Sequence, residues 1–232
     1  MDPRPEVRQR FRTVVDRISA ACRQAGRDPS SVRLMAVSKF HPAESIRAVY
    51  SEAGRDLGEN YPQELANKAE ELKDLPGLRW HAIGSLQSNK VPLIARYASA
   101  FHALDRLKIA ATLGQHRLRV SLGSPLSCYV QVKLSREAQK GGVSEEALED
   151  FLERARNIEG IEIIGLMTLP SFDQTPEERR PAFAKLRELA ERHRLSGLSM
   201  GMSDDFEVAI AEGATIIRVG TDIFGPRPPK EA

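Results

Sequence analysis

Apolar residues recur at helical spacing near the start of the chain and then fall into short runs separated by amphipathic segments. The first set lies on one face of a predicted helix: Val7, Phe11, Val14, Val15, Ile18, Ala21 and Cys22. Gly26 suits the carboxyl end of this helix because glycine adopts the left-handed conformation easily. We therefore expect the chain to begin with a long amphipathic helix.

Eight short apolar runs follow and have the length and composition of buried strands: residues 32–37, 56–58, 78–83, 100–104, 127–132, 161–167, 198–200 and 216–219. Helical patterns occupy residues 43–53, 63–72, 89–97, 106–119, 145–157, 176–193 and 204–212. Strands that alternate with helices pair in parallel through right-handed crossovers. Eight such strands in 232 residues predict an α/β fold, a closed (β/α)8 barrel of the TIM type that forms a single domain over residues 1–232.

The last predicted strand has no helix pattern after it. The chain continues with Gly225, Pro226 and further prolines, and proline cannot extend a helix. The leading helix, in contrast, precedes every strand. We expect this extra helix to cover the part of the barrel wall that lacks an eighth helix after the last strand.

Composition restricts the classes of partner. The 34 basic and 32 acidic side chains are interspersed and give a formal net charge of +2, so no basic surface for nucleic acid or an anionic membrane is indicated. No stretch approaches the roughly 20 apolar residues of a membrane span, and the first residues lack the apolar core of a signal peptide. Cys22 and Cys128 form neither a disulfide framework nor a metal-ligand spacing. We expect a cytoplasmic protein without a metal site.

Lys39 stands at the end of the first apolar run, where a buried strand should leave the core. Burial disfavours the charged form of lysine, and the neutral amine is the nucleophile of Schiff-base chemistry with aldehydes. Position alone also fits a lysine that simply emerges into solvent. The carboxyl ends of barrel strands form the active face, so the segments that follow the other strands bear on this choice.

Two segments at that face suit a phosphate group. Residues 198–205 have the pattern of a strand, a glycine-containing turn and a helix start at Ser203, which either caps the helix or offers N–H groups to an anion. Gly220 and Thr221 follow the last strand, and phosphate sites of barrels are frequently built after strands seven and eight. Arg218, within an apolar strand, needs either an acidic partner or a ligand.

Asn60 and His81 also belong to this face, but a turn suffices to explain Asn60, and a strand-end histidine is more often a hydrogen-bonded core residue than a catalyst, so we assign neither a catalytic role. In a closed barrel, strand eight pairs with strand one. A lysine after strand one that reacts with aldehydes would therefore lie next to a phosphate-binding site built by the segments after strands seven and eight. Pyridoxal 5′-phosphate (PLP) carries an aldehyde at one end and a phosphate at the other. A phosphosugar aldolase would use the same two groups.

Six ordered motifs, at residues 36–39, 58–60, 80–90, 165–168, 198–205 and 218–225, closely resemble the YggS/PROSC family of pyridoxal phosphate homeostasis proteins. The resemblance implies a fold-type III PLP barrel, like the N-terminal domain of alanine racemase, with Lys39 holding PLP as an internal aldimine. It also implies that Ser203 and the backbone of Gly220 and Thr221 hold the phosphate, and that Arg218 faces the pyridine nitrogen. The implied cofactor-binding residues are Lys39, Asn60, Ser199, Met200, Ser203, Arg218, Gly220 and Thr221, with Ser199 and Met200 lining the pocket. Tyr61 and Pro62 depart from the more polar pair expected at the rim of the pocket.

An arginine at the pyridine nitrogen stays protonated and leaves the ring a poorer electron sink, which disfavours carbanion chemistry. Alanine racemase, by resemblance, also needs a tyrosine from a separate domain. We expect this chain's four tyrosines to serve packing: Tyr50, Tyr61, Tyr97 and Tyr129. We therefore expect a monomeric, non-enzymatic PLP carrier that delivers PLP to PLP-dependent apoenzymes. A small PLP-dependent racemase or related enzyme is the alternative, and a Schiff-base aldolase is a third.

Overall fold

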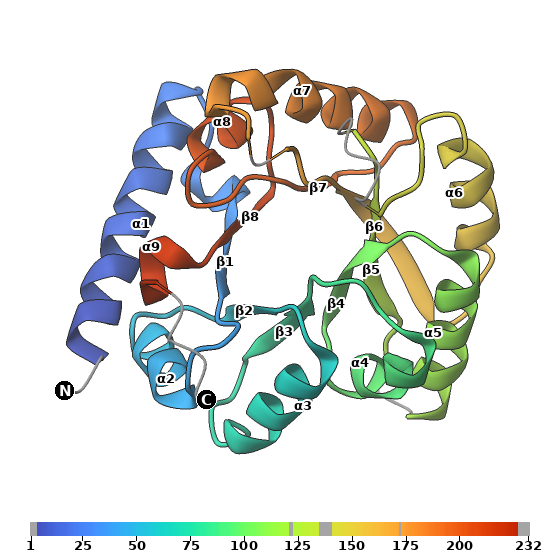
Figure 1. Cartoon of the computed structure of the whole chain (residues 1–232), viewed down its shortest axis with the longest axis horizontal. Helices are drawn as coiled ribbons and strands as arrows, with labels where there is room; N and C mark the ends of the chain where they lie inside the picture. Colours follow the sequence, from blue (N-terminus) through green and yellow to red (C-terminus); the bar gives the residue numbers. More distant parts are fainter. Residues whose placement is uncertain (1–3, 121–122, 135–140, 172, 227–232) are drawn as a thin grey trace.

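Eight parallel strands close into a barrel whose neighbours follow the order of the chain, and helices surround it (Figure 1). The structure, a computed structural model, describes residues 4–120, 123–134, 141–171 and 173–226. The strands are β1 (Arg33–Val37), β2 (Asp56–Glu59), β3 (Arg79–Ala82), β4 (Ala100–Leu104), β5 (Leu126–Gln131), β6 (Ile161–Met167), β7 (Gly197–Ser199) and β8 (Ile216–Val219). The predicted TIM-type barrel is confirmed, and each predicted strand end lies within one residue of the observed one.

The helices follow the predicted alternation: α1 (Arg4–Gln24), α2 (Ala43–Ser51), α3 (Pro62–Glu71), α4 (Val91–Tyr97), α5 (Leu107–Arg119), α6 (Leu148–Arg156), α7 (Pro176–Arg192), α8 (Phe206–Ala211) and α9 (Thr221–Phe224), with the short 3-10 helices η1 (Pro29–Ser31) and η2 (Ser88–Lys90). The pattern over 89–97 divides into η2 and α4. The pattern over 204–212 is shorter in the structure, because the carboxylate of Asp205 accepts the N–H of Met202 in the preceding turn.

Helix α1 covers the barrel wall beside β8 and β1, as predicted. It packs between α2 on one side and α8 and α9 on the other (Figure 1). Val14 and Ile18 are buried on its inner face. Val15, predicted on the same face, is 39% exposed, because it is one residue and about 100° of rotation away from Val14. Among the described residues, only the single turn α9 follows β8; residues 227–232, which include the further prolines, lie outside the described residues.

Polar side chains lie within the barrel among the apolar core. Asp56, His81, His102, Ser199 and Arg218 come from β2, β3, β4, β7 and β8, and each is no more than 5% exposed. Burial of this many polar groups requires hydrogen-bond partners within the protein.

No helix of the described residues is long and apolar enough to span a membrane.

Candidate functional site

A cavity of about 550 Å³ opens among the carboxyl ends of β1, β2, β3 and β8 and the turn before α8. This volume is in the usual range of small-molecule sites. Six of the eight predicted cofactor-binding residues line it: Lys39, Asn60, Ser203, Arg218, Gly220 and Thr221. Parallel pairing of β8 with β1 brings the last predicted segment next to the first one. The fold therefore gathers residues that are as many as 182 positions apart, from Lys39 to Thr221.

The turn that carries Lys39 is held on both sides by side chains of α3. The carbonyl of Ser38 accepts a hydrogen bond from Nζ of Lys68 at 2.7 Å. The N–H of Phe40 donates to Oε1 of Glu64 at 2.6 Å. Phe40 itself has a φ of 68°, an uncommon conformation for a residue with a side chain. These contacts fix the backbone around Lys39, whose side chain is half-buried at the cavity.

Lys68 joins two carboxylates beneath this turn. Its ammonium lies 2.7 Å from Oε1 of Glu59 and 2.8 Å from Oε1 of Glu64, and Lys68 is only 7% exposed. Ser38 donates its hydroxyl to the same Glu59 oxygen at 2.6 Å. Burial raises the pKa of Glu59, although Lys68 and Ser38 oppose the shift. Oε2 of Glu59 is buried without a hydrogen-bond partner among the described residues. The sequence indicated Glu59 only as a neighbour of Asn60.

Two short backbone segments face the cavity with unused donors. Within the described residues, the N–H groups of Ser203, Asp204, Thr221 and Asp222 take part in no hydrogen bond. All four residues line the cavity. Adjacent backbone N–H groups that point into one hollow form a binding site for an anion. The two segments predicted to follow strands seven and eight at a phosphate site thus line one cavity, each with backbone N–H groups that have no partner among the described residues.

The turn before α8 depends on a glycine and on a buried arginine. Gly201 has a φ of 91°, and a Cβ at this position would lie 2.7 Å from Cβ of Ala209. Nη1 of Arg179 lies 2.6 Å from Asp204 and 2.7 Å from Asp205, and Asp205 in turn accepts the N–H of Met202. The position of Met202 is thus set through Asp205 and Arg179, neither of which lines the cavity.

Helix α1 connects the two backbone segments that carry these N–H groups, residues 203–204 and 221–222. Arg17 pairs with Asp222 of α9 through Nη1 at 2.5 Å and with Glu207 of α8 through Nη2 at 2.7 Å. Its guanidinium also lies 4.5 Å from the ring centroid of Phe206. The leading helix, which the sequence predicted as a cover for the wall, therefore also contributes to the geometry of the cavity.

Arg218 reaches the cavity from β8 and is 4% exposed. Nη1 donates to Oγ of Ser199 at 2.8 Å, and Nη2 donates to the carbonyl of Thr168 at 3.0 Å. Neither partner is an acid, and no ion pair of Arg218 occurs within the part of the chain that the structure describes. Burial lowers the pKa of Arg218 to about 10, so the group stays charged at neutral pH. A structural ion pair is therefore not the explanation for this arginine.

Ser199 and Met200 lie behind the lining of the cavity and not in it, which corrects the prediction that they line the pocket. Both are 0% exposed. Ser199 is on β7, where its hydroxyl faces the barrel interior and contacts Arg218 and His102. Met200 belongs to the apolar core. Ser199 thus contacts a residue of the lining, and Met200 packs in the apolar core.

Two histidines near the site are not indicated by the sequence pattern. His41 lines the cavity two residues after Lys39 and stacks on Phe224 at 5.2 Å between ring centroids, and burial lowers its pKa. His102 lies at the centre of β4 and is 0% exposed. Its position could not be inferred from the pattern, because all five residues of β4 are buried and show no alternation. For His41, the proximity to Lys39 in the sequence was the available signal.

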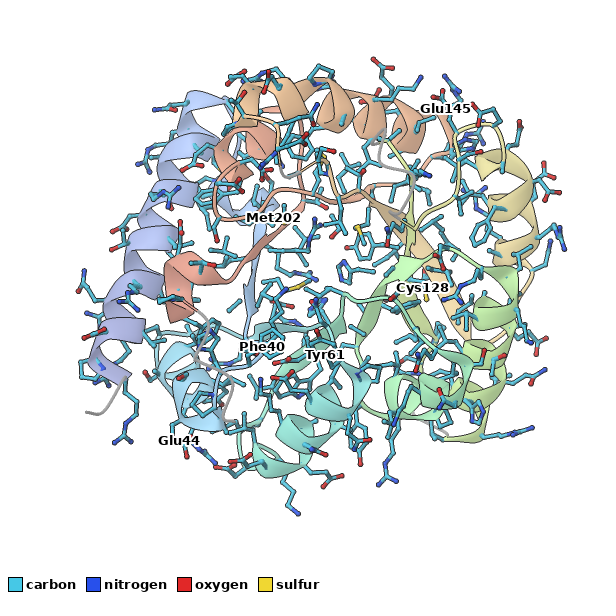
Figure 2. All side chains as sticks on the ribbon, viewed as in Figure 1. Phe40, Glu44, Tyr61, Cys128, Glu145 and Met202 are labelled. Atoms are coloured by element: carbon cyan, nitrogen blue, oxygen red, sulfur yellow. The ribbon has the colours of Figure 1, made fainter. Side chains whose placement is uncertain are left out.

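The rim of the cavity carries an exposed aromatic pair. Phe40 is 41% exposed and Tyr61 is 51% exposed, with ring centroids 5.5 Å apart. Figure 2 shows the two residues side by side, with Met202 across the barrel from them in this view. Tyr61 therefore packs on the residue that follows Lys39. The remaining three tyrosines lie elsewhere: Tyr50 and Tyr97 donate to Pro76 and Glu70, and Tyr129 stacks on His102 inside the barrel.

The sequence matches the family described as the N-terminal domain of alanine racemase over residues 12–228. It is 45% identical over 216 residues to the pyridoxal phosphate homeostasis protein of Pseudomonas aeruginosa, and the match covers 92% of this chain and 93% of the relative. The chain belongs to the pyridoxal phosphate homeostasis protein family. The predicted membership of this family is thus confirmed, and its curated relatives are named as homeostasis proteins and not as enzymes.

Solved structures extend this comparison. The structure of PipY from Synechococcus elongatus with PLP bound is 36% identical, covers 94% of this chain and 100% of that chain, and has a TM-score of 0.81. An alanine racemase from Clostridium difficile has a TM-score of 0.68 at 14% identity, and the match covers 96% of this chain but 58% of the racemase. The second likeness concerns the fold alone. Membership of the family therefore rests on relatives that match nearly the full length of this chain.

Proposed function

We propose that this chain binds PLP in the cavity beside Lys39, as a single barrel domain that serves PLP homeostasis and does not turn over a substrate. The observation that carries the proposal is the meeting of the Lys39 amine with Arg218 and with the unused N–H groups of Ser203 and Thr221 in one cavity. The relatives' name and the PLP bound to PipY support it.

The donors around the cavity fit both ends of this ligand. PLP supplies an aldehyde that condenses reversibly with a primary amine. Lys39 would provide that amine from a turn whose backbone is fixed by Lys68 and Glu64. The backbone of residues 203–204 and 221–222 would hold the phosphate, since it presents four N–H groups without a partner among the described residues. Asn60 would contact the ligand from the end of β2.

Arg218 would face the ring end of the ligand. Its pKa of about 10 keeps the guanidinium protonated at neutral pH, so it can donate to a ring nitrogen but cannot give that nitrogen a stable proton. A ring left unprotonated withdraws electrons weakly. The residue therefore favours holding the ligand over stabilising a carbanion.

The tyrosines also argue against a racemase. None of the four lines the cavity as defined by the described residues. Tyr50 and Tyr97 have partners on the outer helices, Tyr129 lies inside the barrel, and Tyr61 is at the rim. A two-base reaction at the bound amino acid needs a second acid–base group close to the reacting atom. A carrier that delivers PLP to apoenzymes needs no such group.

Two measurements test the proposal together. Titration of the protein with PLP, followed by its visible absorbance, should give saturable binding that Lys39→Ala weakens strongly. Chiral chromatography of D- and L-amino acids incubated with the PLP-loaded protein should show no exchange. Failure to bind PLP would contradict the binding function, whereas exchange abolished by Lys39→Ala would establish a racemase.

A further inference from the structure

A continuous row of hydrogen bonds runs through the barrel from Arg218 to Asp56. Arg218 donates to Oγ of Ser199 at 2.8 Å, and this oxygen lies 2.9 Å from Nδ1 of His102. Nε2 of His102 lies 2.9 Å from Nδ1 of His81, and Nε2 of His81 lies 2.8 Å from Oδ1 of Asp56. All five residues are at most 5% exposed. The row joins β8, β7, β4, β3 and β2 across the interior.

The chemistry of the two ends determines where each proton lies. An ionised Asp56 can only accept, so His81 must carry its proton on Nε2. A neutral His81 then accepts at Nδ1 and requires the proton of His102 to be on Nε2. The Nδ1 atom of His102 is left as the acceptor of the Ser199 hydroxyl. Every donor in the row therefore points away from Arg218 and toward Asp56.

The electrostatic surroundings support these protonation states. Burial would raise the pKa of Asp56, but hydrogen bonds from Arg79 and His81 outweigh it and hold the pKa below its ordinary value. Burial lowers the pKa of His81, which Asp56 opposes. The pKa of His102 is lowered well below the ordinary 6.5, first by burial and then by electrostatic interactions with His81, Arg218 and Arg33 that oppose a positive charge on its ring. Both imidazoles are thus neutral at neutral pH.

The charged and titratable groups around the row come from several elements. Arg33 of β1 lies 4.0 Å from Asp56, and Arg79 lies 2.6 Å from it. Tyr129 of β5 stacks on His102 with 4.2 Å between ring centroids, and burial raises the pKa of this phenol. Asp205 is the acid that favours the charged form of Arg218 from outside the row. No group among these described neighbours offers a second proton acceptor to Ser199.

We propose that Ser199, His102, His81 and Asp56 form a one-way hydrogen-bond chain that orients the guanidinium of Arg218 toward the ring of the bound ligand. Because the Ser199 proton is committed to His102, the serine can present only a lone pair to Arg218. Aligned donors also strengthen one another in a low-dielectric interior. Ser199 and His102 are therefore positioning residues for Arg218. The inference rests on the proposed function, because the ring belongs to the proposed ligand.

The first test uses the unliganded protein and does not depend on PLP. Nitrogen-15 NMR of labelled histidine should show His81 and His102 each protonated at Nε2 alone, with side-chain protons that exchange slowly. An Nδ1 proton or a positive charge on His102 would overturn the proposal, because Ser199 would then have to direct its own proton toward Arg218.

The second test uses three variants and PLP labelled at its ring nitrogen. Ser199→Ala removes the acceptor of Arg218, and His102→Phe removes both ring nitrogens while it keeps the stacking on Tyr129. Ser45→Ala is the matched control, since it also removes one buried hydroxyl (Ser45 is 3% exposed) but lies on α2 outside the row. Ser199→Ala and His102→Phe should weaken PLP binding about tenfold. In both variants the chemical shift of the PLP ring nitrogen should also move toward the value of a protonated nitrogen. Ser45→Ala should change neither the affinity for PLP nor this chemical shift.

The outcomes separate this inference from the proposed function. Folded Ser199→Ala and His102→Phe proteins that bind PLP with the parent's affinity and ring-nitrogen shift would overturn the hydrogen-bond chain as a positioning device. If both variants fail to fold, the imidazole spectra of the parent decide the proposal. If the parent binds no PLP, the proposed function fails and the role of Arg218 toward the ring fails with it, while the imidazole spectra still decide the direction of the row.

Discussion

At the scale of single residues, buried charge shapes the cavity. Lys68 and Arg218 are both nearly inaccessible, but their partners differ: Lys68 contacts two carboxylates, and Arg218 contacts a hydroxyl and a carbonyl. A buried cation with anionic partners holds structure together, whereas a buried cation with neutral partners keeps attraction for an anion or a lone pair. The first therefore supports the turn of Lys39, and the second is available to a ligand.

The raised pKa of Glu59 predicts how the stability of the protein depends on pH. Its pKa is raised in the folded protein, so the folded state binds the proton more readily than the unfolded state does. The contribution of Glu59 to stability is therefore greatest at low pH and declines as pH rises from the ordinary pKa of 4.5 through the folded pKa. The loss is about 1.4 kcal/mol for each unit by which the pKa is raised. Glu59→Gln should remove this decline.

Urea unfolding at a series of pH values measures the difference between the parent and Glu59→Gln. Glu162→Gln is the control, because Glu162 is exposed on β6 and should leave the pH curve as it is in the parent. A difference between parent and Glu59→Gln that stays constant with pH would show that Glu59 is ionised in the folded protein as easily as in the unfolded chain.

Single residues also show how much of the candidate site could be predicted from the sequence. Lys39, Ser203 and Thr221 could be located because they follow apolar runs at one face of a predicted barrel. Lys68 could not, because a lysine on a predicted helix has no pattern that distinguishes a buried ammonium from a solvated one. Ser199 was associated with the pocket, but its orientation toward Arg218 and His102 depends on the register of β7 with its neighbours.

At the scale of elements, the turns after the strands carry the chemistry and the helices hold the turns. The turn between β7 and α8 shows how narrow the steric tolerance is. Gly201 combines a positive φ of 91° with close contacts, whereas Gly26 has a positive φ of 66° and no atom within 4 Å of the place that a Cβ would occupy. A comparison of substitutions at Gly201 and Gly26 therefore separates the cost of backbone strain from the cost of steric overlap.

Gly201→Ala should destabilise the protein more than Gly26→Ala does. Both substitutions place a Cβ in the left-handed region, at about 1–2 kcal/mol. Gly201→Ala adds overlap with Ala209 and Phe206, at about 1–3 kcal/mol, and should also weaken PLP binding because the following residues line the cavity. Urea unfolding and PLP titration measure the two effects. Equal costs for the two variants would contradict the steric account of this turn.

Helix α1 provides a second prediction at this scale. Phe11 is 6% exposed on its inner face, and Val15 is 39% exposed. Phe11→Ala should lower the free energy of unfolding by about 3–5 kcal/mol through the cavity that it leaves. Val15→Ala should change it by no more than about 0.5 kcal/mol. Chemical unfolding of both variants checks the difference, and a small cost for Phe11→Ala would mean that α1 is not an integral part of the barrel wall.

The elements were the most predictable part of the fold, because strand and helix periodicities differ and each strand was bounded by turn residues. Three strands, β4, β6 and β8, match the predicted ranges at both ends. The start of α8 was less predictable, because Asp205 uses its carboxylate for the N–H of Met202, and this contact depends on Arg179 from α7. Such contacts between distant elements have no local signal.

At the scale of the whole molecule, closure of the barrel makes the site. Strand β8 pairs with β1, and this pairing brings Arg218 and Gly220 beside the strand that precedes Lys39. Closure also makes an interior in which polar side chains from five strands meet, which no single segment of the sequence reveals. The outer helices then connect segments that are far apart in the chain, as Arg17 of α1 does for α8 and α9 (Figure 1).

The central claim is that Lys39 is the residue through which the protein holds PLP. Reduction of the PLP-loaded protein with borohydride, followed by digestion and mass spectrometry of the peptides, tests it most directly. We expect a yellow protein in which Lys39 carries the PLP-derived mass, and no comparable label at any lysine of Lys39→Ala. A colourless protein, or a label spread over other lysines with Lys39 unmodified, would contradict the account.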